Sequence, residues 1–123
     1  MTVLVEIRHP AEFILSEATG QRSRDTITIA SGAGIIAAGT VLGKVTATGK
    51  YFASAVGASD GSEVPAAVNI HGADASAADV QVSAILRDAE VNGKCLTYHA
   101  DRDQAAEKTA ANEALKSLGV IVR

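Results

Sequence analysis

The chain has 123 residues, a length that favours one domain, and its 11 basic and 14 acidic residues give a formal net charge of −3. This near-neutral charge argues against a direct nucleic-acid partner, which would select a basic face. The single cysteine, Cys95, excludes an internal disulfide and a cysteine-based metal cluster, and no apolar run approaches membrane-spanning length. We therefore expect a protein that folds in a reducing cytoplasm and has no membrane partner.

The apolar residues are mostly small. Hydrophobic residues make up 47% of the chain, aromatic residues only 3%, and tryptophan is absent. Alanine, valine and isoleucine must therefore fill the core, and each buries less area than an aromatic residue. We expect a single copy to be only moderately stable and to gain stability from association.

Residues 1–24 differ from the rest of the chain. One short apolar cluster, Phe13-Ile14-Leu15, lies among charged and polar residues, and the segment has neither a helical period nor a long strand alternation. The cluster has no evident use inside a domain. We predict an extended arm, partly disordered on its own, that binds a partner through this cluster.

The body is predicted to span residues 25–123 and to begin with short strands. The stretches "DTITIA" at 25–30 and "TVLGKVTA" at 40–47 alternate apolar and polar residues, and "YFASAV" at 51–56 returns after a turn at 48–50. Further strands are predicted at 66–70, at 80–91 as the longest, and at 120–123. Asn92-Gly93 favours a tight hairpin, with "KCLTY" at 94–98 as the partner strand.

One helix is predicted near residues 102–118. Asp101 and Gln104 have the spacing of a capping box, and Gly119 suits the left-handed residue that ends a helix, with Val120 packing back on it. The apolar face of this helix consists of Ala111, Ala114, Leu115 and Leu118. The predicted fold class is mainly β, with one short C-terminal helix and an extended N-terminal arm.

The glycine-rich stretch "SGAGIIAAGTVLGK" at 31–44 does not fit a phosphate-binding loop. Gly34 and Gly39 have the right gap, but Thr40 stands where the loop needs lysine. The residues after Lys44 alternate like a strand, whereas the loop requires a helix there. We predict that these glycines form turns and hold no nucleotide.

Other candidates for chemistry are few. His9, His71 and His99 lie far apart in the sequence, and only His99 with Asp101 resembles a pair of metal ligands, which is too few for a site. No serine lies in a G-x-S-x-G elbow, and Asp88 with Glu90 is typical of a solvated rim. We predict no catalytic residue, no cofactor and no metal.

Several linked stretches resemble the lambda-type bacteriophage head decoration proteins, in family order. They are "SRDTITIASGAGIIAAGTVLGKVTATGKY", "DGSEVPAAV", "ADVQVSAILRDAEVN" and "AANEALKSLGVIVR", and the resemblance covers Ser23 to Arg123. The preceding "FILSEATGQRSRD" resembles the arm of longer members. Two departures stand out: Tyr98-His99 replaces a frequent Trp-Pro, and residues 68–72 read "VNIHG" where many members have a Gly-Ile-Leu strand.

The resemblance implies a non-enzymatic virion protein with a β-clip type of fold. Family members form homotrimers on the exterior of the expanded capsid at local three-fold positions and stabilise it against DNA pressure. The implied partner is the phage major capsid protein, to which the arm adds a strand, and assembly takes place in the cytoplasm of the bacterial host. The candidate capsid-binding residues of the arm are Phe13, Ile14, Leu15, Ser16, Arg22 and Arg24.

Two alternatives remain open from the residues. Lys44 or Lys50 would carry a lipoyl or biotinyl group in a carrier domain, although Lys50 follows Thr48-Gly49 and lacks the Asp or Met that flanks a modified lysine. A virion-displayed module that binds host glycans is the other alternative, and the near absence of aromatic residues counts against it.

Overall fold

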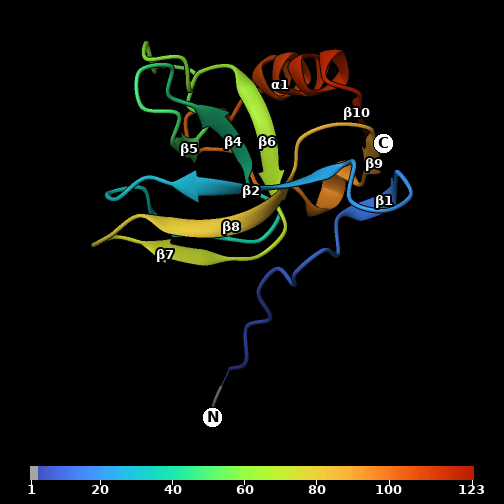
Figure 1. Ribbon diagram of the computed structural model, residues 1–123, viewed down its shortest axis with the longest axis horizontal. Coiled ribbons are helices and arrows are strands. Elements are labelled where there is room, and N and C mark those ends of the chain that lie inside the picture. Colours follow the sequence, from blue (N-terminus) through green and yellow to red (C-terminus); the bar gives the residue numbers. More distant parts are fainter. Residues whose placement is uncertain (1–2) are drawn as a thin grey trace.

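The computed structural model describes residues 3–123, and its strands form a small closed barrel with further elements around it (Figure 1). The elements in chain order are β1 (Ile14–Glu17), β2 (Arg24–Ile29), β3 (Gly34–Ile36), β4 (Val41–Lys44), β5 (Tyr51–Ala53), β6 (Pro65–Asn69), β7 (Ala73–Ala75), β8 (Val80–Ile85), β9 (Ala89–Val91), the 3-10 turn η1 (Gly93–Cys95), α1 (Ala105–Ser117) and β10 (Val120–Val122). This arrangement confirms the predicted fold class, mainly β with one C-terminal helix.

The barrel closes in the strand order β2-β5-β4-β6-β8. β2 and β8 pair antiparallel along their whole length, from Arg24↔Ile85 to Ile29↔Val80. The predicted turn at 48–50 joins β4 and β5, which pair antiparallel. Small aliphatic residues and one tyrosine fill the interior: Ile27, Ile29, Leu42, Tyr51, Ala67, Val82 and Ala84.

The connection from β5 to β6 crosses over β4, because β4 lies between these two strands in the barrel. We call residues 54–64 the crossover loop. It passes so close to Gly43 that a Cβ there would collide with the carbonyl oxygen of Ser62. Glycine is therefore needed at this position for close backbone approach.

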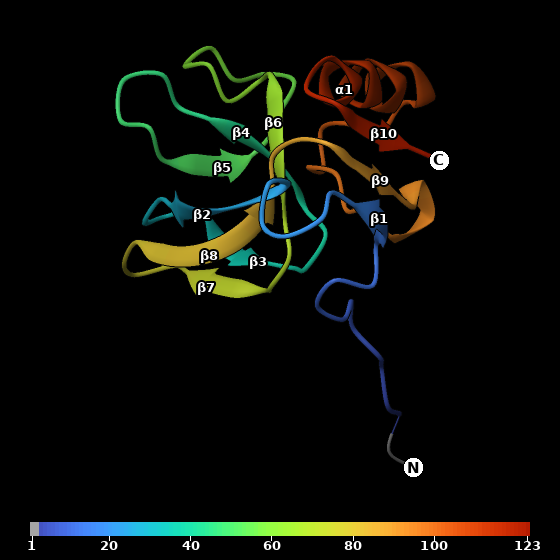
Figure 2. The same cartoon turned by 45° about the vertical axis from the view of Figure 1, so that its right-hand side comes forward.

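A three-stranded sheet in the order β1-β9-β10 lies beside the barrel, and α1 packs near it (Figure 2). The second hydrophobic core joins this sheet to barrel strands and to α1. It contains Phe13, Val41, Val68, Ile70, Ile85, Ala89, Val91, Leu96, Leu115 and Val120. Gly119 ends the helix with φ 88°, and its N–H donates to the Lys116 carbonyl at 2.9 Å. The predicted helix end is confirmed, since Val120 and Leu115 share this core.

The predicted single strand at 80–91 is wrong in one respect. Asp88 adopts φ 50°, and the chain leaves the barrel between β8 and β9 to enter the second sheet. Alternation continues across this turn in the sequence, so a single strand and two short strands in different sheets give the same pattern.

The predicted hairpin at Asn92-Gly93 is also wrong. Asn92 has φ −85°, and its side chain accepts the Lys94 N–H at 3.0 Å as the cap of η1. A Cβ on Gly93 would lie 2.9 Å from Val122 Cγ1, so this glycine permits the approach of β10. β9 pairs with β1 and β10, and from residues 94–98 only Thr97 makes an isolated bridge.

A separate two-stranded sheet, β3-β7, lies beside the barrel. β3 pairs antiparallel with β7, with Ile35 opposite Asp74, in segments where we had predicted turns and a loop. Ile36 and Ala75 face inward and join the barrel core, while Ile35 faces outward and is 80% exposed.

The chain joins the body earlier than the predicted boundary at residue 25. Phe13 is fully buried, and β1 pairs with β9. The segment from Phe13 onward therefore packs on the body, and the freely extended part is its first described residues, 3–10 (Figure 1). We use the term arm for this exposed segment below.

Candidate functional site

The apolar cluster 13–15 is divided between the core and the surface. The Phe13 side chain is 0% exposed and lies in the core with Leu115, and its carbonyl accepts the Asn92 N–H at 2.7 Å. Ile14 is half-buried against the same core, whereas Leu15 is 53% exposed. The interpretation that this cluster has no use inside the domain is therefore wrong for Phe13, because the residue fills the space between the second sheet and α1.

Two of the predicted arginines form ion pairs with the body. The Arg24 guanidinium binds both carboxylate oxygens of Glu17, at 2.7 and 2.9 Å, across the turn between β1 and β2. This hydrogen-bonded pair lowers the pKa of Glu17 and raises the pKa of Arg24. Arg22 Nε lies 3.3 Å from Asp88 Oδ2 and its side chain is largely exposed. Such pairs contribute at most about 1 kcal/mol each, so they orient the turn more than they stabilise the fold.

Ser16 is bonded to the neighbouring strand. Its hydroxyl donates to Glu90 at 3.0 Å, and Arg123 Nη2 donates to the same carboxylate at 2.7 Å. The hydrogen bonds from Arg123 and then Ser16 lower the pKa of Glu90. Ser16 thus joins β1, β9 and the C-terminal residue at the surface.

The arm is the most exposed apolar segment of the described chain. Val3, Leu4, Val5 and Ile7 are 76–90% exposed. The arm is tied to the body near its base, where Arg8 Nη2 donates to the Lys94 carbonyl at 3.0 Å. The sequence pattern indicated binding at 13–15 and not at these residues. Their signal was the apolar run "VLVEI", which has no partner pattern inside the domain.

Two of the histidines and one of the lysines considered for metal binding or modification form ion pairs within the chain. His99 Nδ1 lies 2.9 Å from Asp101 Oδ1, and His9 pairs with Glu6. Between residues 3 and 123, no group of three or more His, Cys, Asp or Glu side chains could hold a metal ion. The amino group of Lys50, the lysine considered for a lipoyl group, lies 2.6 Å from the Asp79 carboxylate.

Over the same described range, no helix is long and apolar enough to cross a bilayer.

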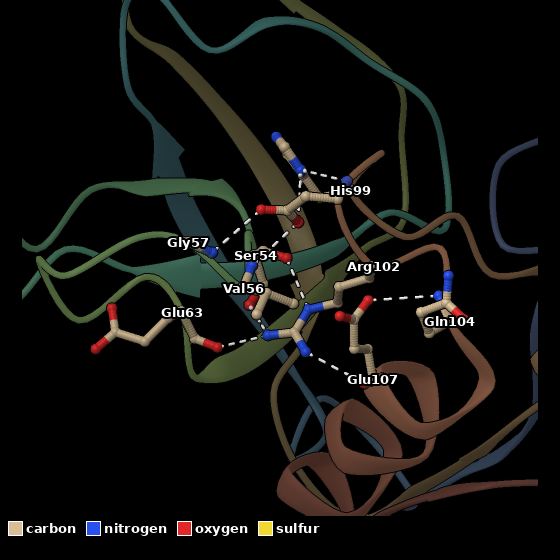
Figure 3. A network of polar contacts seen from close by, with 9 residues as sticks. Ser54, Val56, Gly57, Glu63, His99, Arg102, Gln104 and Glu107 are labelled. Atoms are coloured by element: carbon tan, nitrogen blue, oxygen red, sulfur yellow. Dashed lines mark hydrogen bonds and ion pairs between the residues drawn. The ribbon is translucent and has the colours of Figure 1, made fainter.

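A buried arginine holds the crossover loop in place (Figure 3). Arg102 is 5% exposed and is the one buried charged side chain of the described residues. Its Nε donates to the Ser54 carbonyl at 2.9 Å, and Nη2 donates to the Glu63 carbonyl at 2.6 Å. Further bonds reach Ser54 Oγ and the Glu107 carbonyl, both at 3.2 Å. The guanidinium therefore joins both ends of the crossover loop to the first turn of α1.

The adjacent Asp101 fastens the same loop. Its carboxylate accepts the N–H groups of Val56 at 3.0 Å and Gly57 at 3.1 Å (Figure 3). Burial alone would raise the pKa of Asp101, but these bonds, followed by the bond from His99, outweigh it and lower the pKa. The predicted capping role of Asp101 is wrong, because its carboxylate binds the N–H groups of the crossover loop instead of those of the helix.

The start of the helix is correspondingly later than predicted. α1 begins at Ala105, and Glu107 accepts the backbone N–H of Gln104 at 3.4 Å. A carboxylate in the first turn also suits the positive end of the helix dipole.

The Tyr98-His99 departure is accommodated before this helix. The Tyr98 hydroxyl donates to Asn112 of α1 at 2.6 Å, and its ring packs against the second core. Lys108 Nζ lies 5.7 Å from the centre of the Tyr98 ring. Burial is the main cause that raises the pKa of this tyrosine.

The geometry defines a small, mainly β structural domain that extends an apolar arm from its surface. The family model described as bacteriophage lambda head decoration protein D matches residues 3–120, nearly the whole chain. The chain belongs to this family, which confirms the resemblance seen in the sequence. It is a structural protein that associates with the phage capsid. A comparison with curated proteins gave no match.

Proposed function

We propose that the protein forms homotrimers on the outer surface of the expanded capsid, at local three-fold positions, and stabilises the shell against the pressure of packaged DNA. The partner is the phage major capsid protein, and assembly takes place in the cytoplasm of the bacterial host. Family membership supports the capsid role, and the aromatic-poor core supports a gain from association.

The exposure of the arm is the observation that carries this proposal. Apolar side chains that are 76–90% exposed contribute little to the folding stability of the free protein. Each would contribute about 1.5–3 kcal/mol if fully buried on a partner. An extended backbone can also add as a strand to a partner sheet, which supplies main-chain hydrogen bonds.

Three arms in one trimer would act together. Once one arm is bound, the others bind at a high effective concentration, so the affinity of the trimer exceeds that of a single arm.

Leu15, exposed on β1, extends the contact surface toward the body, whereas Phe13 belongs to the core.

Imaging tests the proposal directly. Purified protein is mixed with expanded, undecorated heads and examined by electron cryo-microscopy. We expect density on the outer surface at local three-fold positions, and we expect decorated heads to withstand heating longer than bare heads. Density at other positions, or unchanged resistance of decorated heads, would contradict it.

A deletion of residues 1–7 tests the contribution of the arm to binding separately from that of the body. We expect the deletion to preserve folding, because four of these side chains are almost fully exposed, and to abolish most binding to heads. The matched control is Leu118→Ser, which alters an exposed apolar residue at the end of α1. Equal head occupancy by the deletion variant and the full chain would remove this role of the arm.

A further inference from the structure

A surface-exposed isoleucine marks an apolar groove at the base of the arm. Ile35 is 80% exposed in the middle of β3, while its neighbour Ile36 is buried in the barrel core. The groove is lined by Ile7, Pro10, Ile35, Ala37, Ala38 and Ala73. Its walls therefore come from the arm on one side and, on the other, from the two-stranded β3-β7 sheet and the residues that follow β3.

The charged residues of this groove are already bonded. Arg8 donates to the Lys94 carbonyl at 3.0 Å, and Asp74 accepts the N–H and the hydroxyl of Ser76, at 3.1 and 2.6 Å. These two are the charged side chains among the groove-lining residues that the structure describes. An occupant with apolar, uncharged side chains fits such a surface, whereas a nucleic acid or an acidic segment would find no free cation.

The groove is continuous with the arm. Ile7 lines the groove and also ends the run of exposed apolar side chains that begins at Val3. The views agree that β7 and the arm lie at one end of the molecule and α1 at the other (Figures 1 and 2). A partner held by the arm would therefore face the groove and not the helix.

We propose that this groove is a second docking site for the capsid shell, and that it receives an apolar segment of a major capsid protein subunit against Ile35. This inference rests on the proposed function, because it takes the partner of the arm to be the shell. It adds a contact made by the folded body, so the shell would be bound both by the extended arm and by a surface that is already formed in the free protein. The preformed part binds without the ordering cost that the arm has to overcome.

Three substitutions test the groove. Ile35→Ser removes the apolar anchor, Ile35→Val retains it, and Val64→Ser changes a 56% exposed valine at the end of the crossover loop as the matched control. Binding to expanded heads is measured by titration, with Tm and sedimentation of each free variant alongside. We expect Ile35→Ser to weaken binding about 10- to 100-fold per site. Ile35→Val should bind within about fivefold of wild type, because it removes one methylene, and Val64→Ser should bind like wild type.

Each outcome has a distinct meaning. Wild-type binding by Ile35→Ser overturns the groove and leaves the proposed function standing, whereas failure of the wild-type chain to bind heads contradicts the proposed function itself. A photo-crosslinking benzoylphenylalanine in place of Ile35 identifies the occupant. We expect a product that joins this chain to the capsid protein. A product that joins two copies of this chain, or loss of the trimer in Ile35→Ser, would assign the groove to subunit association and overturn the inference.

Discussion

Phe13 and Leu15 lie two residues apart, a spacing that places both side chains on one face of a regular strand. The register of β1 against β9 shifts between Ile14 and Ser16, and this bulge separates the two environments. We expect Phe13→Ala to lower the free energy of unfolding by about 3–5 kcal/mol, because it leaves a cavity in the second core. Leu15→Ala should lower it by less than about 1 kcal/mol.

Urea denaturation of both variants measures this difference, and head binding separates it from function. If Phe13→Ala kept wild-type stability and lost only head binding, Phe13 would be a contact residue and its burial in the core would carry no weight.

Gly43 is a second position at which one residue determines stability, because there is no space for a side chain. A Cβ at this position would collide with the backbone carbonyl of Ser62, which cannot rotate away as a side chain could. We expect Gly43→Ala to cost at least about 2 kcal/mol of stability. Gly57→Ala is the matched control in the crossover loop, since its nearest neighbour would be Asp101 Oδ2 at 3.7 Å. Equal Tm values for the two variants would show that the crossover loop moves freely over β4.

At the level of elements, the crossover loop depends on Arg102. Removing its side chain leaves the carbonyl groups of Ser54, Glu63 and Glu107 without this donor. Hydrogen bonds to a charged group contribute about 1.5–3 kcal/mol each, so we expect Arg102→Met to destabilise the fold by about 3 kcal/mol or more. Arg102→Lys should recover only part of the loss, because an ammonium lacks the planar fork.

Hydrogen exchange locates the effect of Arg102→Met. The N–H groups of Val56 and Gly57, which Asp101 holds, should exchange faster in Arg102→Met. The matched control is Arg87→Met, which removes an exposed arginine paired with Asp25 and should leave exchange in the crossover loop unchanged. Unaltered exchange at Val56 and Gly57 in Arg102→Met would mean that Asp101 alone holds the loop.

The elements differ in how far local sequence predicts them. β2, the β4–β5 hairpin, the C-terminal strand and the end of α1 follow from alternation and from Gly119, because local geometry decides them. The step from the barrel to the second sheet at Asp88 depends on long-range pairing and leaves no local pattern. A buried arginine between two aspartates has the same sequence signature as a solvated charge run, so Arg102 could not be recognised. For the candidate site, the sequence placed binding at 13–15 within an arm of residues 1–24. The burial of Phe13 could not be predicted, since it depends on which side chain fills a gap in the core.

At the scale of the whole molecule, the two ends differ in how much apolar surface they expose. The end with α1 is closed by Arg102 and by the core under the helix, and it supplies stability. The opposite end carries the arm and the groove beside β3, where apolar side chains remain exposed. Exposed apolar surface of this extent marks an interaction site, and burying it on a partner would be favourable.

The same small-residue core leads to a prediction about concentration. The two buried large aromatic side chains of this 12.5 kDa chain are Phe13 and Tyr51, so we expect it to gain stability if copies associate. Unfolding of the proposed trimer would release three chains. Mass action then raises Tm with protein concentration, by an amount on the order of 5 °C over a hundredfold range. Calorimetry at the two ends of that range measures the shift, and sedimentation equilibrium at the same concentrations gives the mass. The deletion of residues 1–7 should show the same dependence, because the proposed function assigns the arm to the shell and leaves the contacts between copies to the folded bodies. A Tm that stays constant over this range, with a mass equal to one chain, would contradict the trimer and leave the arm to bind the shell from single copies.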